Sequence, residues 1–487
     1  MTVATGAPAR TVGDASTIRR RGAAGAALLT ARAAAAQVVA FGGTVALTHL
    51  LAPASLGVVA FGATIVSIGT FFSDGGVGAT LIRGRTEPTL TELQTLLGFQ
   101  LAFALAIAVV AALVGLEMGT TGAVTAVMVS SLPLLAVRAP HAIALERALD
   151  YRAIASVEFV ESLVQYAWAI PTVWALGWGV WGLATAALVR CAAGSVLMSA
   201  ASPLPALMRP RILAGTLRSM LGFGLGVQAV GIAGVARAQG INLLVAAVGG
   251  TGSLGLWSLA TRVLFVPFWL FQALWRVSYP TMARLRSLGE DTTQTVQRLA
   301  EMTALAASAI LAPLAASAYT LVPGVFGSSW GAAAAPVIWA SAGLVVSAPI
   351  SVAASGYLFS EGDVRSPLKA ATLGAAVFLA LAAGLVPPLG VAGAGVAWMF
   401  ASLAEAVVFA YALRRRAQLA VERFIWVSVV LAVASALGGW ALPHPGSSRL
   451  AQGLTTAVAT LLLYAALSFV FNRATVVASA NRLRALR

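Results

Sequence analysis

The chain has 487 residues, of which 59% are hydrophobic and 10% are charged, and its formal net charge at pH 7 is +15. This composition is too apolar for a soluble globular protein and predicts a polytopic membrane protein. The basic residues lie in short segments between apolar runs, so the positive charge indicates membrane topology and not nucleic-acid binding. The single cysteine, Cys191, excludes an intramolecular disulfide and a cysteine metal cluster.

The first apolar run follows a basic segment, Arg19–Arg21, as in a secretory signal. It is too long for the hydrophobic part of such a signal, and many similar runs follow, so we expect it to be an uncleaved first span. The histidines His49, His141 and His444 fall in different predicted loops and lack the spacing of metal ligands. No metal site is therefore expected.

Runs of about 20 apolar residues define about fourteen candidate transmembrane helices. The runs are continuous and do not alternate, which favours helices over the strands of a barrel. The first six cover residues 24–48, 56–80, 95–115, 120–143, 156–176 and 180–201. The next six cover 219–247, 253–275, 296–322, 333–357, 367–387 and 391–412, and a last pair covers 422–442 and 451–471.

Arginine and lysine gather in the N-terminal segment and in every second loop after it, whereas the remaining loops carry only Arg449. This alternation predicts an even number of spans, with both termini in the cytoplasm and the protein in the cytoplasmic membrane. Tryptophans near the opposite ends of the spans are expected to form an aromatic belt at the membrane surface. These are Trp178, Trp181, Trp257, Trp330 and Trp440.

Two pairs of similar segments indicate an internal repeat. Ser-Leu-Gly begins the second span at Ser55–Gly57 and the eighth at Ser253–Gly255, while Gly179–Val189 and Gly390–Phe400 begin the sixth and twelfth spans. Chance similarity between glycine- and alanine-rich helices is the alternative, but the corresponding positions favour a true repeat. We therefore expect two six-helix lobes related by a pseudo-two-fold axis along the membrane normal, with the substrate at their interface.

The predicted fold is thus an all-α membrane protein of two six-helix lobes and a C-terminal helix pair. Residues 1–23 form a cytoplasmic segment, 24–208 the N-lobe, 209–416 the C-lobe, 417–472 the last pair and 473–487 a cytoplasmic tail. The connections between spans are short, so we expect the function to lie within the bilayer.

Four arginines fall inside predicted spans, where a charged side chain is costly: Arg32, Arg190, Arg237 and Arg262. Arg262 is about 13 Å along its helix and so near the membrane midplane. We expect these arginines to line a cationic cavity between the lobes that binds an anionic substrate. The alternative is that each arginine pairs with a buried acid or caps a kinked helix.

Two acids, Asp74 and Glu405, are candidates for ion coupling. Asp74 precedes two glycines, so a helix break whose amide groups Asp74 caps is favoured over an ion site. Glu405 is either a proton site or the partner of an arginine. No catalytic constellation or glycine-rich phosphate loop occurs in the sequence, so we expect no enzyme activity and no cofactor.

Four segments carry a resemblance to a known family: His49–Arg83, Glu146–Glu158, Tyr279–Leu285 and Leu321–Val337. They resemble polysaccharide exporters of the multidrug/oligosaccharidyl-lipid/polysaccharide (MOP) flippase superfamily. His49–Arg83 is similar to the family's first-to-second helix region, and Glu146–Glu158 to its fourth-to-fifth loop. Leu321–Val337 is similar to the start of the tenth helix, and Tyr279–Leu285 to a motif at the end of the eighth. Together these similarities cover most of residues 25–412.

The resemblance implies alternating access and transport of undecaprenyl-diphosphate-linked oligosaccharide to the outer leaflet, as in lipopolysaccharide, teichuronic acid and capsule exporters. It implies membrane lipids and the polyprenyl-diphosphate-linked glycan as partners, with a glycan polymerase or glycosyltransferases as further candidates. Three alternatives stay open: a lipid II flippase, a MATE-type drug or cation antiporter, and a non-transporting scaffold for glycan assembly. The antiporter is disfavoured because the first helix carries Arg32, whereas drug-extruding members typically carry an acid there.

Overall fold

The computed structural model describes residues 35–84, 86–288, 292–442, 448–473 and 477. Every regular element in these residues is a helix, which confirms the predicted all-α class. Ten of the described helices are long and apolar enough to cross a membrane, and two shorter apolar helices, Ala35–Leu50 and Ile425–Ala441, accompany them. A total of about fourteen spans stays a prediction.

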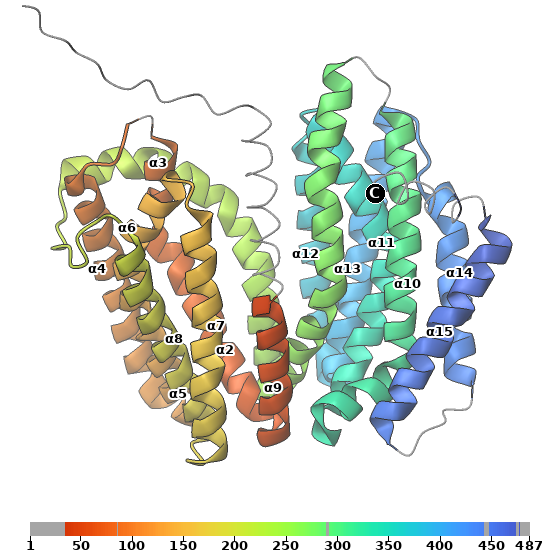
Figure 1. Ribbon diagram of the computed structural model, residues 1–487, viewed down its shortest axis with the longest axis horizontal. Helices are drawn as coiled ribbons and strands as arrows, with labels where there is room; N and C mark the ends of the chain where they lie inside the picture. Colours follow the sequence, from red (N-terminus) through yellow and green to blue (C-terminus); the bar gives the residue numbers. More distant parts are fainter. Residues whose placement is uncertain (1–34, 85, 289–291, 443–447, 474–476, 478–487) are drawn as a thin grey trace, which may run out of the picture.

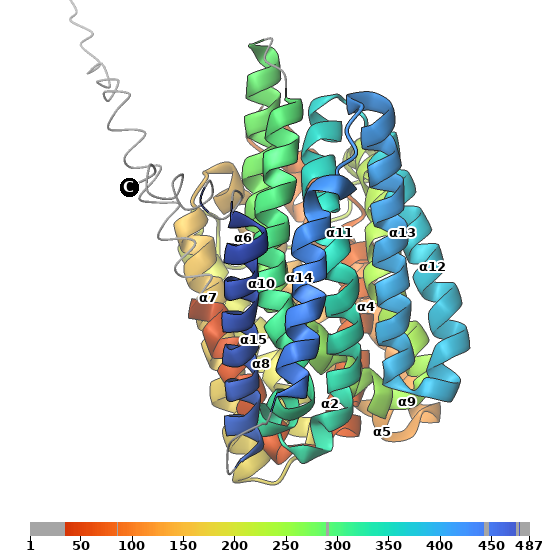
Figure 2. The same cartoon turned by 90° about the vertical axis from the view of Figure 1, so that its right-hand side faces the viewer.

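The helices form two groups that lie side by side (Figure 1). The first contains Ala35–Leu50, α2 (Pro53–Asp74), α3 (Val77–Arg83), α4 (Leu90–Glu117), α5 (Gly119–Val129), α6 (Leu132–Arg147), α7 (Tyr151–Trp174) and α8 (Val180–Ala201). The second contains the end of α9 (Ala214–Ser287), α10 (Thr293–Phe326), η1 (Ser328–Ala333), α11 (Ala334–Ser360), α12 (Arg365–Leu389) and α13 (Val391–Ala417). The last pair, α14 (Glu422–Ala441) and α15 (Arg449–Phe471), packs on α10 at the outer edge of the second group, as Figure 2 shows.

The observed helices differ from the predicted spans in three places. The second span is broken where Gly75 (φ 55°) and Gly76 (φ 71°) separate α2 from α3, as Asp74 and its two glycines predicted. The fourth is interrupted between α5 and α6. The seventh and eighth join in α9, which changes direction at Gly250 (φ 74°, ψ 178°). Glycine takes such a conformation without steric cost, so the chain can turn there with no intervening loop.

Helix α9 belongs to both groups. Near its start, Met220 packs in a core cluster with Val77 and Leu96 of the first group. Before the turn at Gly250, Val245 packs in a different cluster with Phe378 of the second group. Figure 1 shows the corresponding path, from the top of the left group to the bottom centre.

The turns α6–α7 and α11–α12 repeat the same backbone geometry. The amides of Asp150 and Asp363 each donate to the carbonyl five residues earlier, over 2.9 Å in both cases. The preceding residues, Leu149 (φ 55°) and Gly362 (φ 76°), both have left-handed backbones. Each aspartate then accepts a hydrogen bond from an amide of the next helix. These shared details, at corresponding positions of the two groups, agree with the predicted repeat.

The segments that suggested the repeat also match in structure. Gly179 (φ 53°, ψ −126°) and Gly390 (φ 59°, ψ −145°) precede α8 and α13 with nearly the same dihedral angles. The two Ser-Leu-Gly segments meet where α2 crosses α9, because a Cβ built on Gly57 would lie 1.7 Å from the Thr251 carbonyl oxygen. The pseudo-two-fold relation therefore passes through this crossing.

The turns that carry most of the described basic residues lie at the upper end of the bundle in Figure 1, here called the basic end. At the opposite end the two groups touch. The Trp330 indole donates to the Thr48 carbonyl oxygen over 2.9 Å, and the His49 Nε2 lies 3.0 Å from the Val325 carbonyl oxygen. Together with the α2–α9 crossing, these contacts close the end opposite the basic end.

At the basic end, two ion pairs hold the α11–α12 turn. Arg286 pairs with Glu361, and Arg416 lies 3.1 Å from Asp363. Burial raises the pKa of the Asp363 carboxyl, but hydrogen bonds from the Ser366 hydroxyl and amide, with the Arg416 charge and the Arg365 amide, outweigh burial and lower the pKa below its ordinary value. The turn is therefore most stable with Asp363 ionised.

The expected aromatic belt is only partly present. Trp178, Trp181 and Trp440 are exposed, but Trp257 and Trp330 are buried, with 1% and 0% of their surface accessible. Placing these two in the belt was wrong, because Trp257 packs against aromatic side chains of α12 and α13 and Trp330 closes the end of the bundle.

Candidate functional site

Arg262 lies between the two helix groups. One of its guanidinium nitrogens donates to the Thr44 hydroxyl over 2.5 Å, and this hydroxyl in turn donates to the Ala40 carbonyl oxygen over 2.8 Å. Thr44 belongs to the helix Ala35–Leu50 and is buried, whereas Arg262 is exposed. The contact thus joins α9 to the first helix of the other group.

Among the described residues, Arg262 has no carboxylate partner. The hydroxyl of Thr44 is neutral, so the charge of the guanidinium is not compensated there. An arginine carries five N–H donors, and its planar group can hold two phosphate oxygens at once. This side chain can therefore bind an anion.

Arg237 has a different environment. Its guanidinium lies 2.5 Å from the Glu405 carboxylate, and the pair connects α9 with α13. The prediction left Glu405 divided between a proton site and an arginine's partner, and the structure shows the ion pair. Because the two charges compensate each other, this position is neutral overall.

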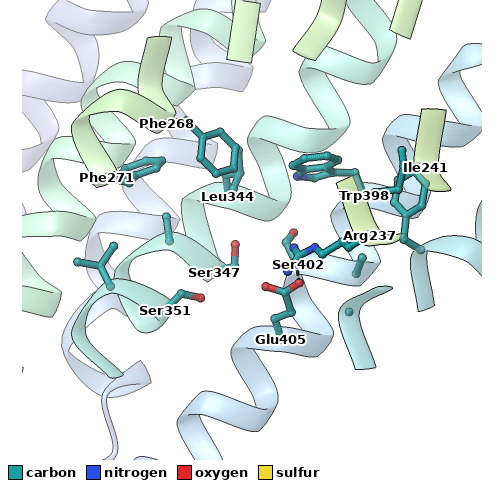
Figure 3. Close-up of a pocket in the computed structure, with 15 residues that line it drawn as sticks. Arg237, Ile241, Phe268, Phe271, Leu344, Ser347, Ser351, Trp398, Ser402 and Glu405 are labelled. Atoms are coloured by element: carbon teal, nitrogen blue, oxygen red, sulfur yellow. Dashed lines mark ion pairs between the residues drawn. The ribbon is translucent and has the colours of Figure 1, made fainter. Parts of the chain in front are cut away.

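The Arg237–Glu405 pair borders a cavity of about 170 Å³ enclosed by α9, α11, α12 and α13 (Figure 3). Hydroxyl groups of Ser347, Ser351 and Ser402 line one side. Aromatic and aliphatic side chains line the other: Ile241, Phe268, Phe271, Leu344, Phe378 and Trp398. The cavity lies within the second group and not between the two groups.

Glycine makes room for the carboxylate of Glu405. A Cβ built on Gly374 of α12 would lie 2.2 Å from Glu405 Oε1. The first group repeats this arrangement, since a Cβ on Gly194 of α8 would lie 1.6 Å from Glu161 Oε1 of α7. In each group a glutamate between the fifth and sixth helices thus lies against a glycine of the neighbouring helix.

Glu161 has two basic neighbours. Arg138 of α6 lies 2.5 Å from its carboxylate, and Arg190 of α8 lies within electrostatic range of it. The Arg190 Nε is buried without a hydrogen-bond partner among the described residues. Glu158 also lies within electrostatic range of Glu161, so two guanidinium groups face two carboxylates and the cluster carries no excess positive charge.

Asp74 caps the break between α2 and α3. Its carboxylate lies close to the backbone amides of Gly76 and Gly78, and Gln100 of α4 donates to Oδ1 over 3.1 Å. This position at the helix break agrees with the favoured capping role. Ion coupling at Asp74 stays a prediction.

The predicted arginines therefore have separate partners: Arg262 contacts Thr44, Arg237 contacts Glu405, and Arg190 lies near Glu161. Arg32 lies outside the described residues, so its place in a shared cavity stays a prediction.

The histidines also differ from their predicted positions. His49 is part of the helix Ala35–Leu50 and His141 is buried within α6, so placing them in loops was wrong, while His444 lies outside the described residues. Within the described part of the chain, no three metal-ligating side chains come together.

Sequence reasoning missed Arg138 and the three serines of the cavity, and it considered Glu161 only as one of several buried acids that could pair with an arginine. A glutamate inside an apolar span is a signal for a basic partner, and the structure shows that Arg138 is the partner of Glu161. The serines carry no such signal, because serine is common in membrane helices and only the fold shows which hydroxyls line a cavity.

Comparisons with known proteins agree with this architecture. A family model described as polysaccharide biosynthesis protein matches residues 46–335. No curated protein matches the chain in sequence. The lipid II flippase MurJ in its inward closed conformation is similar in structure, with a TM-score of 0.73 at 11% identity, covering 92% of this chain and 99% of that one.

An inward-facing multidrug resistance MATE family transporter of the MOP superfamily is also similar, with a TM-score of 0.60 at 15% identity over 80% of this chain and 96% of that one. At such low identities the similarity establishes the fold.

Proposed function

Since the chain belongs to the polysaccharide biosynthesis protein family, we propose that it moves an undecaprenyl-diphosphate-linked oligosaccharide from the inner to the outer leaflet of the cytoplasmic membrane. The observation that carries the proposal is the uncompensated Arg262 between two helix groups that share the fold of a lipid II flippase. The chemistry is transport and not catalysis. Both termini are on the cytoplasmic side in this proposal, which puts the basic end towards the cytoplasm.

Arg262 binds the diphosphate of the lipid carrier. In a partly dehydrated space a guanidinium holds phosphate oxygens more strongly than on an exposed surface. Its contact with Thr44 orients the side chain between the groups before substrate arrives. Arg32 joins Arg262 as a second diphosphate ligand in this proposal.

Alternating access then carries the head group across. The closed contacts opposite the basic end separate while the basic end closes, and the bound diphosphate passes from one leaflet to the other. A glycan polymerase or glycosyltransferases supply and consume the lipid-linked glycan.

The test uses purified full-length protein in lipid vesicles and a polyprenyl-diphosphate-linked oligosaccharide. We expect Arg262→Ala to abolish most flipping, because the variant lacks the proposed ligand of the diphosphate. The variant should still fold, because no acid among the described residues depends on this arginine for charge compensation. Arg262→Lys should keep part of the activity, since lysine retains the charge but loses the planar fork. Arg284→Ala, an exposed arginine near the end of α9, is the matched control and should flip at the wild-type rate.

If Arg262→Ala reaches the wild-type amount in the vesicles and flips normally, the proposed role of Arg262 is wrong. Deletion of the gene separates the substrates: lipid-linked glycan repeats should accumulate on the cytoplasmic face. Accumulation of the peptidoglycan precursor instead would favour a lipid II flippase, the alternative that the structural similarity to MurJ supports.

A further inference from the structure

The cavity beside the Arg237–Glu405 pair has an aromatic side and a polar side. Figure 3 shows Phe268, Phe271 and Trp398 on one side, with Ser347 and Glu405 on the other. The aromatic side belongs to a larger cluster in which Trp398 also contacts the rings of Trp257 and Phe378. Ligand sites are typically of this kind, mostly apolar with a few placed polar groups.

The hydroxyls of this cavity are available to a ligand. Ser347 is only 3% exposed, and neither it nor Ser351 forms a side-chain donor bond within the described residues. Ser402 donates to the Met399 carbonyl oxygen over 2.9 Å and keeps its acceptor capacity. Buried hydroxyls normally have a hydrogen-bond partner, so these groups are suited to one that enters the cavity.

The charges of this cavity select against an anion. Arg237 and Glu405 compensate each other at 2.5 Å, so a phosphate would meet the carboxylate as well as the guanidinium. The pair still offers donors and acceptors at its mouth, since 39% of the Arg237 side chain and 15% of the Glu405 side chain are exposed. A neutral ligand that both donates and accepts hydrogen bonds fits this arrangement.

We infer that the cavity binds one uncharged sugar unit of the lipid-linked glycan. A sugar ring has an apolar C–H face, which packs on Phe268 and Trp398, and hydroxyls, which bond to the serines and to the Arg237–Glu405 pair. The inference rests on the proposed function. The diphosphate of the lipid binds at Arg262, and the sugar unit binds in the cavity. Arg262 and Phe268 are six residues apart on α9, about 9 Å along the helix, so the two places are separated by less than the thickness of one leaflet.

The test compares the binding of two probes to the purified full-length chain: a polyprenyl diphosphate, and the same lipid carrying one glucose. We expect the glucose-bearing lipid to bind about tenfold more tightly, and the double variant Ser347→Ala/Ser351→Ala to reduce this ratio to about two or less. The sugar-free lipid should bind the variant as it binds the wild type. Ser341→Ala is the matched control, a fully buried serine of α11 outside the cavity, and should leave the ratio unchanged.

The outcomes separate the two proposals. If neither lipid binds, the proposed function fails and the sugar site fails with it. If both lipids bind equally, or the serine variants keep the wild-type ratio, only the sugar site is overturned. Tighter binding of a lipid carrying glucuronic acid than of the glucose lipid would overturn the assignment of an uncharged unit.

Discussion

Replacing Gly57 by alanine should open the end of the bundle opposite the basic end. A Cβ at Gly57 would lie 1.7 Å from the Thr251 carbonyl oxygen and 3.0 Å from the Gly255 nitrogen. The reverse contact is nearly equal, because a Cβ at Gly255 would lie 1.9 Å from the Pro53 carbonyl oxygen. Both obstacles are backbone atoms, so no side chain can rotate away to relieve them.

The size of the effect follows from these distances. A carbon and a carbonyl oxygen approach to about 3.3 Å without strain, so α2 and α9 must separate by about 1.6 Å. Overpacking of this kind costs about 1–3 kcal/mol, and the cost falls on the conformation in which the two helices touch. An equilibrium between closed and open ends would shift by about 5- to 150-fold.

A cysteine at position 48 reports this opening. Thr48 is 2% exposed and its carbonyl oxygen accepts the Trp330 hydrogen bond, so a cysteine there is protected while the end is closed. In purified protein with Cys191 replaced by alanine, we expect Gly57→Ala to accelerate maleimide labelling of Thr48→Cys by the factor above. Gly255→Ala should do the same, because the two contacts are reciprocal.

The control is Gly252→Ala, one turn from Gly255 on the same helix. A Cβ there meets no atom within 4 Å, so its labelling rate should equal that of the parent protein. Equal labelling of folded Gly57→Ala and Gly252→Ala proteins would refute the reasoning.

Two further predictions concern topology and pH. A single cysteine at the exposed position Trp178 should react with an impermeant maleimide in intact cells, whereas one at the exposed position Arg415 should react only after permeabilisation. Labelling of position 415 from outside would contradict the topology. Because the folded state lowers the pKa of Asp363 below its ordinary value of 3.8, its contribution to the unfolding free energy should be present above that pH and be lost as the pH falls through the folded pKa. Asp363→Asn should remove this acid-dependent part of the unfolding free energy in detergent, and an unchanged pH profile would show that Ser366 and Arg416 do not stabilise the carboxylate.

Hydropathy predicted the all-helical membrane fold, and the glycines beside Asp74 predicted the break after α2. The same signal misplaced Trp257 and Trp330, because a helix face against lipid and a face against another helix are equally apolar. Hydropathy therefore locates the helices of such a chain but does not show which face of each helix is turned towards lipid.

The arginines show a second limit. The cost of a charge in an apolar span identifies both Arg262 and Arg237 as candidate site residues. Their environments, however, depend on partners 218 and 168 positions away along the sequence. Nothing local to either residue indicates that one contacts a neutral hydroxyl and the other a carboxylate. Only the fold shows that Arg262 is available to an anion, whereas the charge of Arg237 is already compensated by Glu405.

The path of α9 has a consequence for attempts to divide the chain. The loop before residue 214 is the natural place for a cut between two six-helix units, yet a cut there takes Met220 out of the cluster around Val77 and Leu96. A cut at Gly250 instead removes Val245 from the cluster around Phe378. Neither fragment would keep a complete interior, so two separately expressed halves should recover a stable protein only when they are produced together.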